Sequence, residues 1–243
     1  WLVMGLHMNV QGAALATVIA EYATLLIGLM MVRKVLHMRG ISLAMLKQAW
    51  RGNFRRLLAL NRDIMLRSLL LQLCFGAITV LGARLGGDII AVNAVLMTLL
   101  TFTAYALDGF AYAVEAHSGQ AYGARDGSQL LDVWRAACRQ SGIVAILFSL
   151  VYALFGEQIV ALLTSLPQIQ LLADRYLFWQ VVLPLVGVWC YLLDGMFIGA
   201  TRAAEMRNSM AVAAAGFALT LLSLPLLGNH GLWLALTVFL ALR

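Results

Sequence analysis

The sequence predicts an all-α protein that crosses a membrane several times. Of its 243 residues, 63% are hydrophobic and only 12% are charged, and the mean hydropathy is +0.88. Soluble domains carry roughly 25% charged residues. The apolar runs are continuous and approach the roughly 20 residues that a helix needs to span a bilayer. Strands of an outer-membrane barrel would alternate apolar and polar residues instead, so the predicted class is a polytopic helical membrane protein.

Seven apolar helical segments follow one another along the chain. Glycine-rich turns separate the second from the third, at Gly86-Gly87-Asp88, and the third from the fourth, at residues 123–127. Pro167 ends the fourth segment, and Pro184 interrupts the fifth. Gly228 follows the sixth. We place the segments at about residues 8–32, 64–84, 89–122, 130–165, 169–200 and 209–227, with a seventh from residue 231.

The two ends of the chain and one long connection set the expected domains. The chain starts at Trp1 inside an apolar stretch and stops at Arg243 inside another, so we expect a piece of a longer membrane protein. We assign residues 1–32 to one unit, 33–62 to a basic connection and 63–243 to a helix bundle with a truncated last helix. Apolar residues at helical spacing in the connection predict an amphipathic helix in the membrane interface. They are Leu46, Trp50, Phe54, Leu57 and Leu58.

Positive charge predicts how the chain is oriented. Lys and Arg gather in alternate connections, at residues 33–62, 123–139 and 202–207, whereas the connections between them hold few. Because basic loops stay on the cytoplasmic side, we predict that these three face the cytoplasm. This distribution accounts for the net charge of +6, which therefore does not indicate a nucleic-acid partner.

Two hexapeptides of one pattern place carboxylates inside apolar segments. Tyr105–Phe110 and Tyr191–Met196 both read Tyr-x-Leu-Asp-Gly-apolar, and they set Asp108 and Asp194 at similar depth in segments that cross in the same direction. An Asp near the bilayer centre costs about 2.5–3.5 kcal/mol on insertion scales. Such a residue binds a proton, an ion or a cationic ligand, or it is neutralised by a neighbour. We expect both carboxylates to face the bundle interior.

The segment of Asp108 carries a polar stripe. Tyr105, Asp108, Tyr112 and Glu115 are spaced three and four apart, so they share one helix face. Two carboxylates two turns apart, each near a phenol, suit a site for protons or cations, because burial raises carboxyl pKa values toward neutrality. The same stripe also fits a face turned to an aqueous vestibule or paired with another helix.

Two further polar residues have structural alternatives. Arg67, one turn inside the second segment, either pairs with an intramembrane carboxylate such as Asp194 or extends to the cytoplasmic interface. We include it among the candidate binding residues. Asn93 is a weaker candidate, because amide side chains routinely form hydrogen bonds between membrane helices.

Three stretches resemble signatures of the multidrug and toxic compound extrusion (MATE) transporters. Residues 106–126 lie in the third segment of this chain and contain Ala-Leu-Asp-Gly-Phe-Ala and Gly-Gln-Ala-Tyr-Gly-Ala-Arg-Asp. They are similar to the signature of the corresponding span in the C-terminal half of these transporters. Residues 193–203 resemble the matching fifth-span signature, and residues 12–17 resemble the last helix of the N-terminal half. The resemblance implies twelve helices in two six-helix bundles. This chain would then hold the sixth helix and the C-terminal bundle, and the N-terminal bundle would be its partner.

The resemblance also implies a function. It implies an antiporter that exports organic cations and other xenobiotics in exchange for protons or sodium, without a cofactor. Sodium-type members keep an ion-binding carboxylate at the position of Asp194 and pair it with a second acid in the seventh helix. Here that helix has Leu70-Leu71-Gln72 and no acid, so we expect protons rather than sodium.

Two other functions stay open at the level of sequence. A flippase for lipid-linked sugars shares the architecture, but it should line its cavity with several Arg or Lys residues. A non-transporting structural subunit would keep its buried carboxylates locked in pairs. A membrane enzyme is the least favoured class, because the sequence has neither a visible nucleophile–base pair nor a metal-binding motif.

Overall fold

The computed structural model describes residues 9–38 and 54–243, together with Gly5 and Gly40. The chain divides into two compact units, Trp1–Arg55 and Arg56–Arg243, and each is described by itself. In the first unit, α1 (Asn9–Met38) is a single helix whose side chains are almost all exposed. It contains the first predicted segment and continues through Arg33 and Lys34 into the predicted basic connection.

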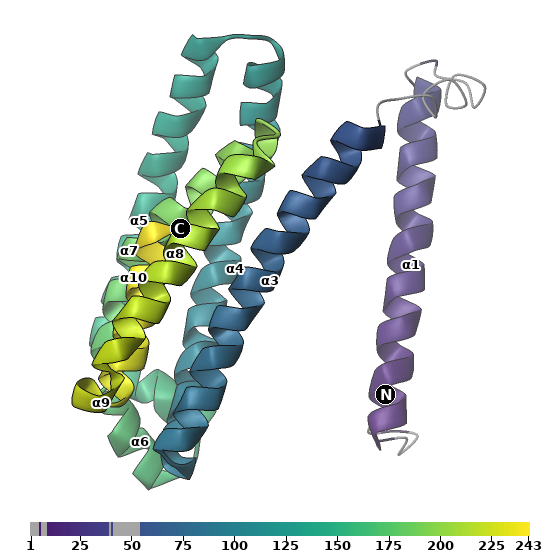
Figure 1. Ribbon diagram of the computed structural model, residues 1–243. Helices are drawn as coiled ribbons and strands as arrows, with labels where there is room; N and C mark the ends of the chain where they lie inside the picture. Colours follow the sequence, from purple (N-terminus) through teal and green to yellow (C-terminus); the bar gives the residue numbers. More distant parts are fainter. Residues whose placement is uncertain (1–4, 6–8, 39, 41–53) are drawn as a thin grey trace. The chain divides into compact units, whose positions relative to one another are not determined.

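The second unit is a bundle of helices, shown in Figure 1. Among the described residues of the whole chain, six helices are long and apolar enough to cross a membrane, as predicted for an all-α polytopic protein. The helices of the second unit are α3 (Phe54–Leu85, of which Phe54 and Arg55 belong to the first unit), α4 (Gly87–Gly123), α5 (Gly127–Leu163), α6 (Pro167–Asp174), α7 (Leu177–Gly199), α8 (Ala203–Thr220), the 3-10 turn η1 (Leu221–Ser223), α9 (Leu224–Leu227) and α10 (Asn229–Leu242).

Two predicted segments differ from the structure at their ends. The fifth, predicted at 169–200, is two helices, because a turn at Arg175 and Tyr176 separates α6 from α7. Tyr176 donates its N–H to the Ala173 carbonyl at 2.8 Å, and its buried ring packs on His230 at 4.7 Å between centroids. The break between α6 and α7 therefore coincides with packing of the Tyr176 ring, and no glycine or proline marks it in the sequence. The second segment begins earlier than predicted, since α3 starts at Phe54.

Three of the five apolar residues of the predicted interfacial helix lie in the described part of the chain. Phe54, Leu57 and Leu58 lie in the first turns of α3, and all three are exposed. Leu46 and Trp50 lie outside the described residues.

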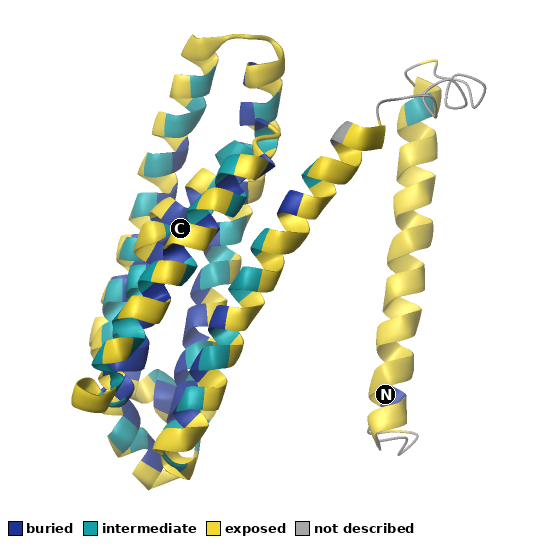
Figure 2. Ribbon diagram, in the orientation of Figure 1, coloured by how far each residue is buried: buried dark blue, intermediate teal, exposed yellow. Residues whose placement is uncertain are grey.

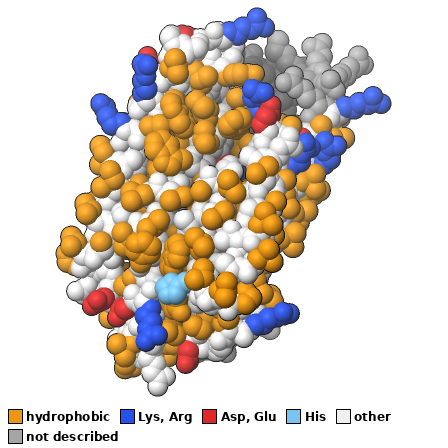
Figure 3. Space-filling view, turned by 60° about the vertical axis from the view of Figure 1, so that its left-hand side comes forward, with side chains coloured by type: hydrophobic (Ala, Val, Ile, Leu, Met, Phe, Trp, Pro, Cys, Tyr) orange, Lys and Arg blue, Asp and Glu red, His pale blue; other side chains and the backbone are white. Residues whose placement is uncertain are grey.

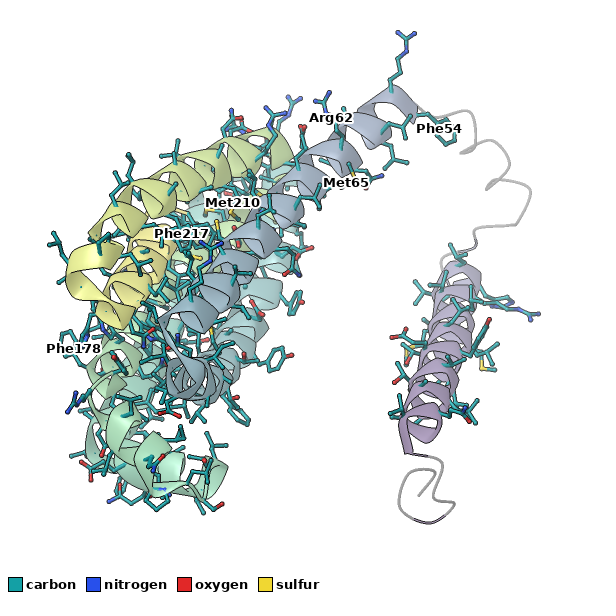
Figure 4. All side chains as sticks on the ribbon, turned by 60° about the horizontal axis from the view of Figure 1, so that its bottom comes forward. Phe54, Arg62, Met65, Phe178, Met210 and Phe217 are labelled. Atoms are coloured by element: carbon teal, nitrogen blue, oxygen red, sulfur yellow. The ribbon has the colours of Figure 1, made fainter. Side chains whose placement is uncertain are left out.

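The core of the bundle is centred on α7, which packs on α4, α5 and α10, while α10 also packs on α8 (Figure 2). Its largest fully buried side chains include Leu96 of α4, Leu183 of α7, and Trp233 and Phe239 of α10. From α8, the buried Met210 and Phe217 join the same core (Figure 4). On the face shown in Figure 3, hydrophobic side chains occupy the middle and charged side chains lie toward the two ends. That distribution is expected for a bundle surrounded by lipid.

Buried amides connect α4 to the start of α10. Asn93 and Asn229 exchange two hydrogen bonds of 2.8 and 2.9 Å, and the Trp233 indole N–H donates to Asn93 Oδ1 at 3.0 Å. A Cβ added at Gly82 of α3 would lie 3.0 Å from Asn93 Nδ2, so α3 passes close to this network. The expectation that Asn93 bonds between helices is confirmed.

Pro184 lies inside α7 and removes one helical hydrogen bond. Proline has no N–H, so the carbonyl of Gln180, four residues earlier, has no helical donor. At the neighbouring carbonyl, Val181 accepts a hydrogen bond of 2.7 Å from the Ser149 hydroxyl of α5. A side chain from another helix therefore supplies a donor at the weakened turn, as membrane helices with internal proline require.

A capping aspartate starts α5 in the turn after α4. Asp126 Oδ1 accepts hydrogen bonds from the Ser128 hydroxyl at 2.6 Å and from the N–H groups of Ser128 and Gln129 at 3.0 and 3.1 Å. The bond from the Ser128 hydroxyl, and then those from the backbone, lower the pKa of this exposed carboxyl below its ordinary value. The charged form is thus the one that caps the helix.

The lowered pKa of Asp126 predicts an effect of acid on the start of α5. The cap's stabilisation is complete above the unfolded-state pKa and is lost as the pH falls through the lower folded-state pKa. Amide hydrogen exchange at Ser128 and Gln129, corrected for intrinsic rates, should therefore accelerate in that acidic range. Asp126→Asn is the control, because Asn can cap without titrating. Equal pH dependence in both proteins would contradict the prediction.

Candidate functional site

The centre of the candidate site is the carboxylate of Asp194 on α7. Its Oδ2 accepts hydrogen bonds from Nη2 of Arg67 on α3 and from Nη2 of Arg243, the C-cap residue of α10, and both contacts are ion pairs. The three side chains are 14%, 13% and 9% exposed, respectively. One carboxylate thus joins three helices inside the bundle. We call Arg67, Asp194 and Arg243 the charged triad.

The charged triad carries more positive than negative charge. Two guanidinium groups share one carboxylate, and the Nε atoms of both arginines are buried without a hydrogen-bond partner among the described residues. The Arg243 guanidinium also lies 5.9 Å from the centre of the Tyr191 ring, within the range of a cation–π contact. Burial of an excess charge is costly, so a further negative group nearby would stabilise the triad.

Asp108 on α4 is that further group. Its half-buried carboxylate interacts electrostatically with Arg243, Asp194 and Arg67, but it forms no hydrogen bond or ion pair within the part of the chain that the structure describes. The two Asp-Gly hexapeptides are therefore brought together, and neither aspartate is isolated in an apolar surface. This agrees with the expectation that both carboxylates face inward.

Close packing of α4 on α7 brings the two hexapeptides together. A Cβ added at Gly195 would lie 2.2 Å from the Ala111 carbonyl oxygen, and one added at Gly199 would lie 2.4 Å from the Glu115 carbonyl oxygen. Gly195 and Gly199 form a Gly-x-x-x-Gly stripe, which lets membrane helices approach closely. Contacts advance by four residues on both helices, so the helices run in the same direction, as predicted.

The remaining predicted residues lie apart from the charged triad. Glu115 is half-buried, and its carboxylate has no hydrogen-bond or ion-pair partner among the described residues. Tyr105 and Tyr112 are 72% and 70% exposed. The polar stripe therefore runs from Asp108, beside the triad, to phenols on the open surface of α4, and within this chain the two tyrosines do not enter the triad.

Comparison with known proteins identifies the family. The MatE family pattern matches residues 64–226, which is more than half of the chain. The chain belongs to the MatE family. It is 90% identical over 243 residues to DNA damage-inducible protein F of Escherichia coli (strain K12), a match that covers 100% of this chain and 53% of that relative. The chain thus spans about half the length of the curated relative that it matches.

In this MatE chain, sequence reasoning missed Arg243. The residue follows an apolar run at the last position of the sequence, where a basic residue reads as the end of a span. Its side chain instead turns inward to Asp194. For Arg67, the structure selects pairing with Asp194 over extension to the interface. Arg243 is thus a second enclosed basic residue beside Arg67.

A second missed residue of the MatE chain is Asp63. It is 6% exposed, and its Oδ1 accepts hydrogen bonds from Arg207 of α8 at 2.7 Å and from Arg62 at 3.0 Å. Arg62 lies near the first turns of α3 in Figure 4. Asp63 and Arg67 are four residues apart, so one face of α3 carries two ion-pair connections, to α8 and to α7. The signal in the sequence was an acid and a base four residues apart, which places them on one face of a helix.

The described residues offer no metal site. No three His, Cys, Asp or Glu side chains among them lie together as ligands. The chemistry available at the site is that of carboxylates and guanidinium groups, namely ion pairing, proton binding and attraction of cations to Asp108 and Glu115.

Proposed function

We propose that this chain is the C-terminal half of a secondary active antiporter that exports organic cations and drugs in exchange for protons. The observation that carries the proposal is Asp108, a half-buried carboxylate beside the charged triad that has no hydrogen-bond or ion-pair partner in the described part of the chain. A carboxylate in this environment can bind and release a proton. Glu115, Tyr105 and Tyr112 extend the polar surface of α4 for a cationic substrate.

The partners of the site follow from the extent of the chain. Because the chain covers 53% of its relative, we assign the missing contacts to the N-terminal six-helix bundle of the same protein. The surrounding partner is lipid of the bacterial inner membrane, with the basic segments 33–62, 123–139 and 202–207 on the cytoplasmic side. The name of the relative refers to induction by DNA damage, and we extend this to the synthesis of the protein that contains this chain.

Sodium is the second choice for the coupling ion. A sodium site needs several oxygen ligands, and the oxygen Oδ2 of Asp194 is already shared by two arginines. No acid replaces Leu71 or Gln72 on α3 to complete such a site. Protons need only one carboxylate that can be emptied and filled, which Asp108 supplies.

The coupling ion can be tested with the full-length protein in proteoliposomes. We expect an imposed pH gradient without sodium to drive movement of a cationic dye, and a sodium gradient alone to have little effect. Asp108→Asn should reduce the pH-driven rate by about tenfold or more, since Asn cannot carry a proton. The matched control is Asp132→Asn, at a side chain that is 76% exposed. Export that requires sodium and ignores the pH gradient would overturn the proposal.

The alternatives make different predictions. A lipid-linked sugar flippase gains some support from Arg243, because it adds a second enclosed basic residue to Arg67. Both guanidinium groups converge on Asp194, however, and do not form an open basic cavity. A flippase would move a pyrophosphate-linked lipid and not a cationic dye in the same vesicles. A structural subunit would move neither, and none of these functions requires an enzyme active site.

A further inference from the structure

Asp194 and Asp108 differ in how they contact the two arginines of the charged triad. Asp194 receives two charge-assisted hydrogen bonds on one oxygen, from helices α3 and α10. Asp108 receives none among the described residues and feels the same arginines only through space. The sequences around the two aspartates are nearly the same, so this difference comes from the neighbours that the fold supplies.

Protonation of Asp194 would leave two enclosed guanidinium groups without the carboxylate that pairs directly with both of them. Arg side chains do not lose their protons in proteins, so both charges would stay. Breaking a buried ion pair by neutralising one partner is strongly destabilising, because an uncompensated buried charge is left behind. Both ion pairs therefore depend on the carboxylate of Asp194.

Protonation of Asp108 has a much smaller structural consequence. No hydrogen bond to its carboxylate among the described residues would be broken. With Asp108 ionised, two arginines face two carboxylates and the cluster is neutral. With Asp108 protonated, the cluster keeps the single positive charge that the triad has by itself. Both states of Asp108 are thus compatible with an intact triad.

We infer that Arg243 is a positioning residue, which together with Arg67 holds the carboxylate of Asp194 in two ion pairs and so leaves Asp108 as the carboxylate that exchanges the proton. The inference rests on the proposed antiport function and divides roles within its site. The step is one proton binding to the ionised carboxylate of Asp108 and leaving it again, with no change at Asp194.

The groups that face Asp108 support this division. Arg243 on α10, Arg67 on α3 and Asp194 on α7 act on its carboxylate. Cys190 and Tyr191 of α7 also lie within electrostatic reach of it. On α4 itself, the nearest titratable neighbours along the face are Tyr105, Tyr112 and Glu115. Arg243 leads the electrostatic interactions at Asp108, so a change at this arginine should be felt at both aspartates.

The experiment is an infrared titration of the full-length protein in detergent. Protonated carboxyl groups absorb separately from carboxylates, so each variant's difference spectrum shows which titrating group it has lost. We expect Asp108→Asn to remove one titrating carboxyl, a group that Asp132→Asn leaves in place. Arg243→Met should add a second one, because Asp194 then has Arg67 alone, whereas Arg243→Lys should retain the spectrum of the parent.

The outcomes separate this inference from the proposed function. An unchanged spectrum in Asp108→Asn, or a titrating carboxyl lost in Asp194→Asn, would overturn the assignment. The absence of a new titrating group in Arg243→Met would overturn the role of Arg243, and the charge-retaining Lys variant distinguishes that role from simple packing. If Asp194→Asn does not fold, the Asp108 and Arg243 variants still decide which carboxylate exchanges the proton and whether Arg243 has the proposed role. Failure of dye export with these spectra as expected would remove the antiport function and leave the division of roles intact.

Discussion

Gly195→Ala is expected to destabilise the protein severely, although the same substitution in an open helix position stabilises. A Cβ at Gly195 would lie 2.2 Å from the Ala111 carbonyl oxygen and 3.0 Å from its carbon. These are backbone atoms of α4, so relief requires the two helices to separate. Overpacking in a rigid core costs typically 1–3 kcal/mol, and we expect a value of about 3 kcal/mol or more here.

Gly109→Ala is the matched control, since Gly109 occupies the same position in the first Leu-Asp-Gly motif. A Cβ there meets nothing within 4 Å among the described residues. Because Ala is favoured over Gly in a helix by about 1 kcal/mol, this variant should be neutral or more stable. Thermal unfolding of both variants in detergent measures the difference. Equal effects would show that α4 and α7 do not pack as described.

Asn93→Leu is expected to give the second large loss of stability. Leu has nearly the shape of Asn, so the main change is that the Asn229 amide and the Trp233 indole N–H lose their partner. These two side chains are 4% and 1% exposed, and water cannot readily replace the bonds. Leaving a buried polar group unsatisfied costs about 1–3 kcal/mol, whereas measured bonds between membrane helices average near 0.6 kcal/mol. We expect a loss of about 2 kcal/mol.

A double variant separates lost hydrogen bonds from altered packing. Asn93→Leu with Asn229→Leu removes both amides of the pair, so only the Trp233 N–H stays unpaired. Replacing both partners of a buried hydrogen bond is nearly neutral, so the double variant should recover part of the stability lost in Asn93→Leu. Guanidinium or heat unfolding followed by Trp fluorescence checks this. A double variant with the summed loss of two single variants would show that packing dominates.

Much of the architecture was predictable because it depends on local composition. Continuous apolar runs near spanning length fix the helices, and glycine or proline marks most of their ends, as at Gly86 and Pro167. The energetic cost of a charge in lipid also places Asp108 and Asp194 toward the interior before any contact is known. The turn at Arg175 and Tyr176 was missed, because buried packing of Tyr176, rather than a helix-breaking residue, accompanies it.

The sequence by itself determined the class of protein, the order of its helices and the two inward carboxylates, because hydropathy and helix length are local properties. Only the tertiary structure decided that Asp194 lies between Arg67 and Arg243, while Asp108 has no such partner within residues 9–38 and 54–243. It also decided that a Cβ at Gly195 would meet a backbone carbonyl, whereas one at Gly109 would meet nothing within 4 Å among the described residues. Two nearly identical hexapeptides differ in this way because charge pairing and close approach depend on residues far away in the chain, which only packing of α3, α4, α7 and α10 brings together.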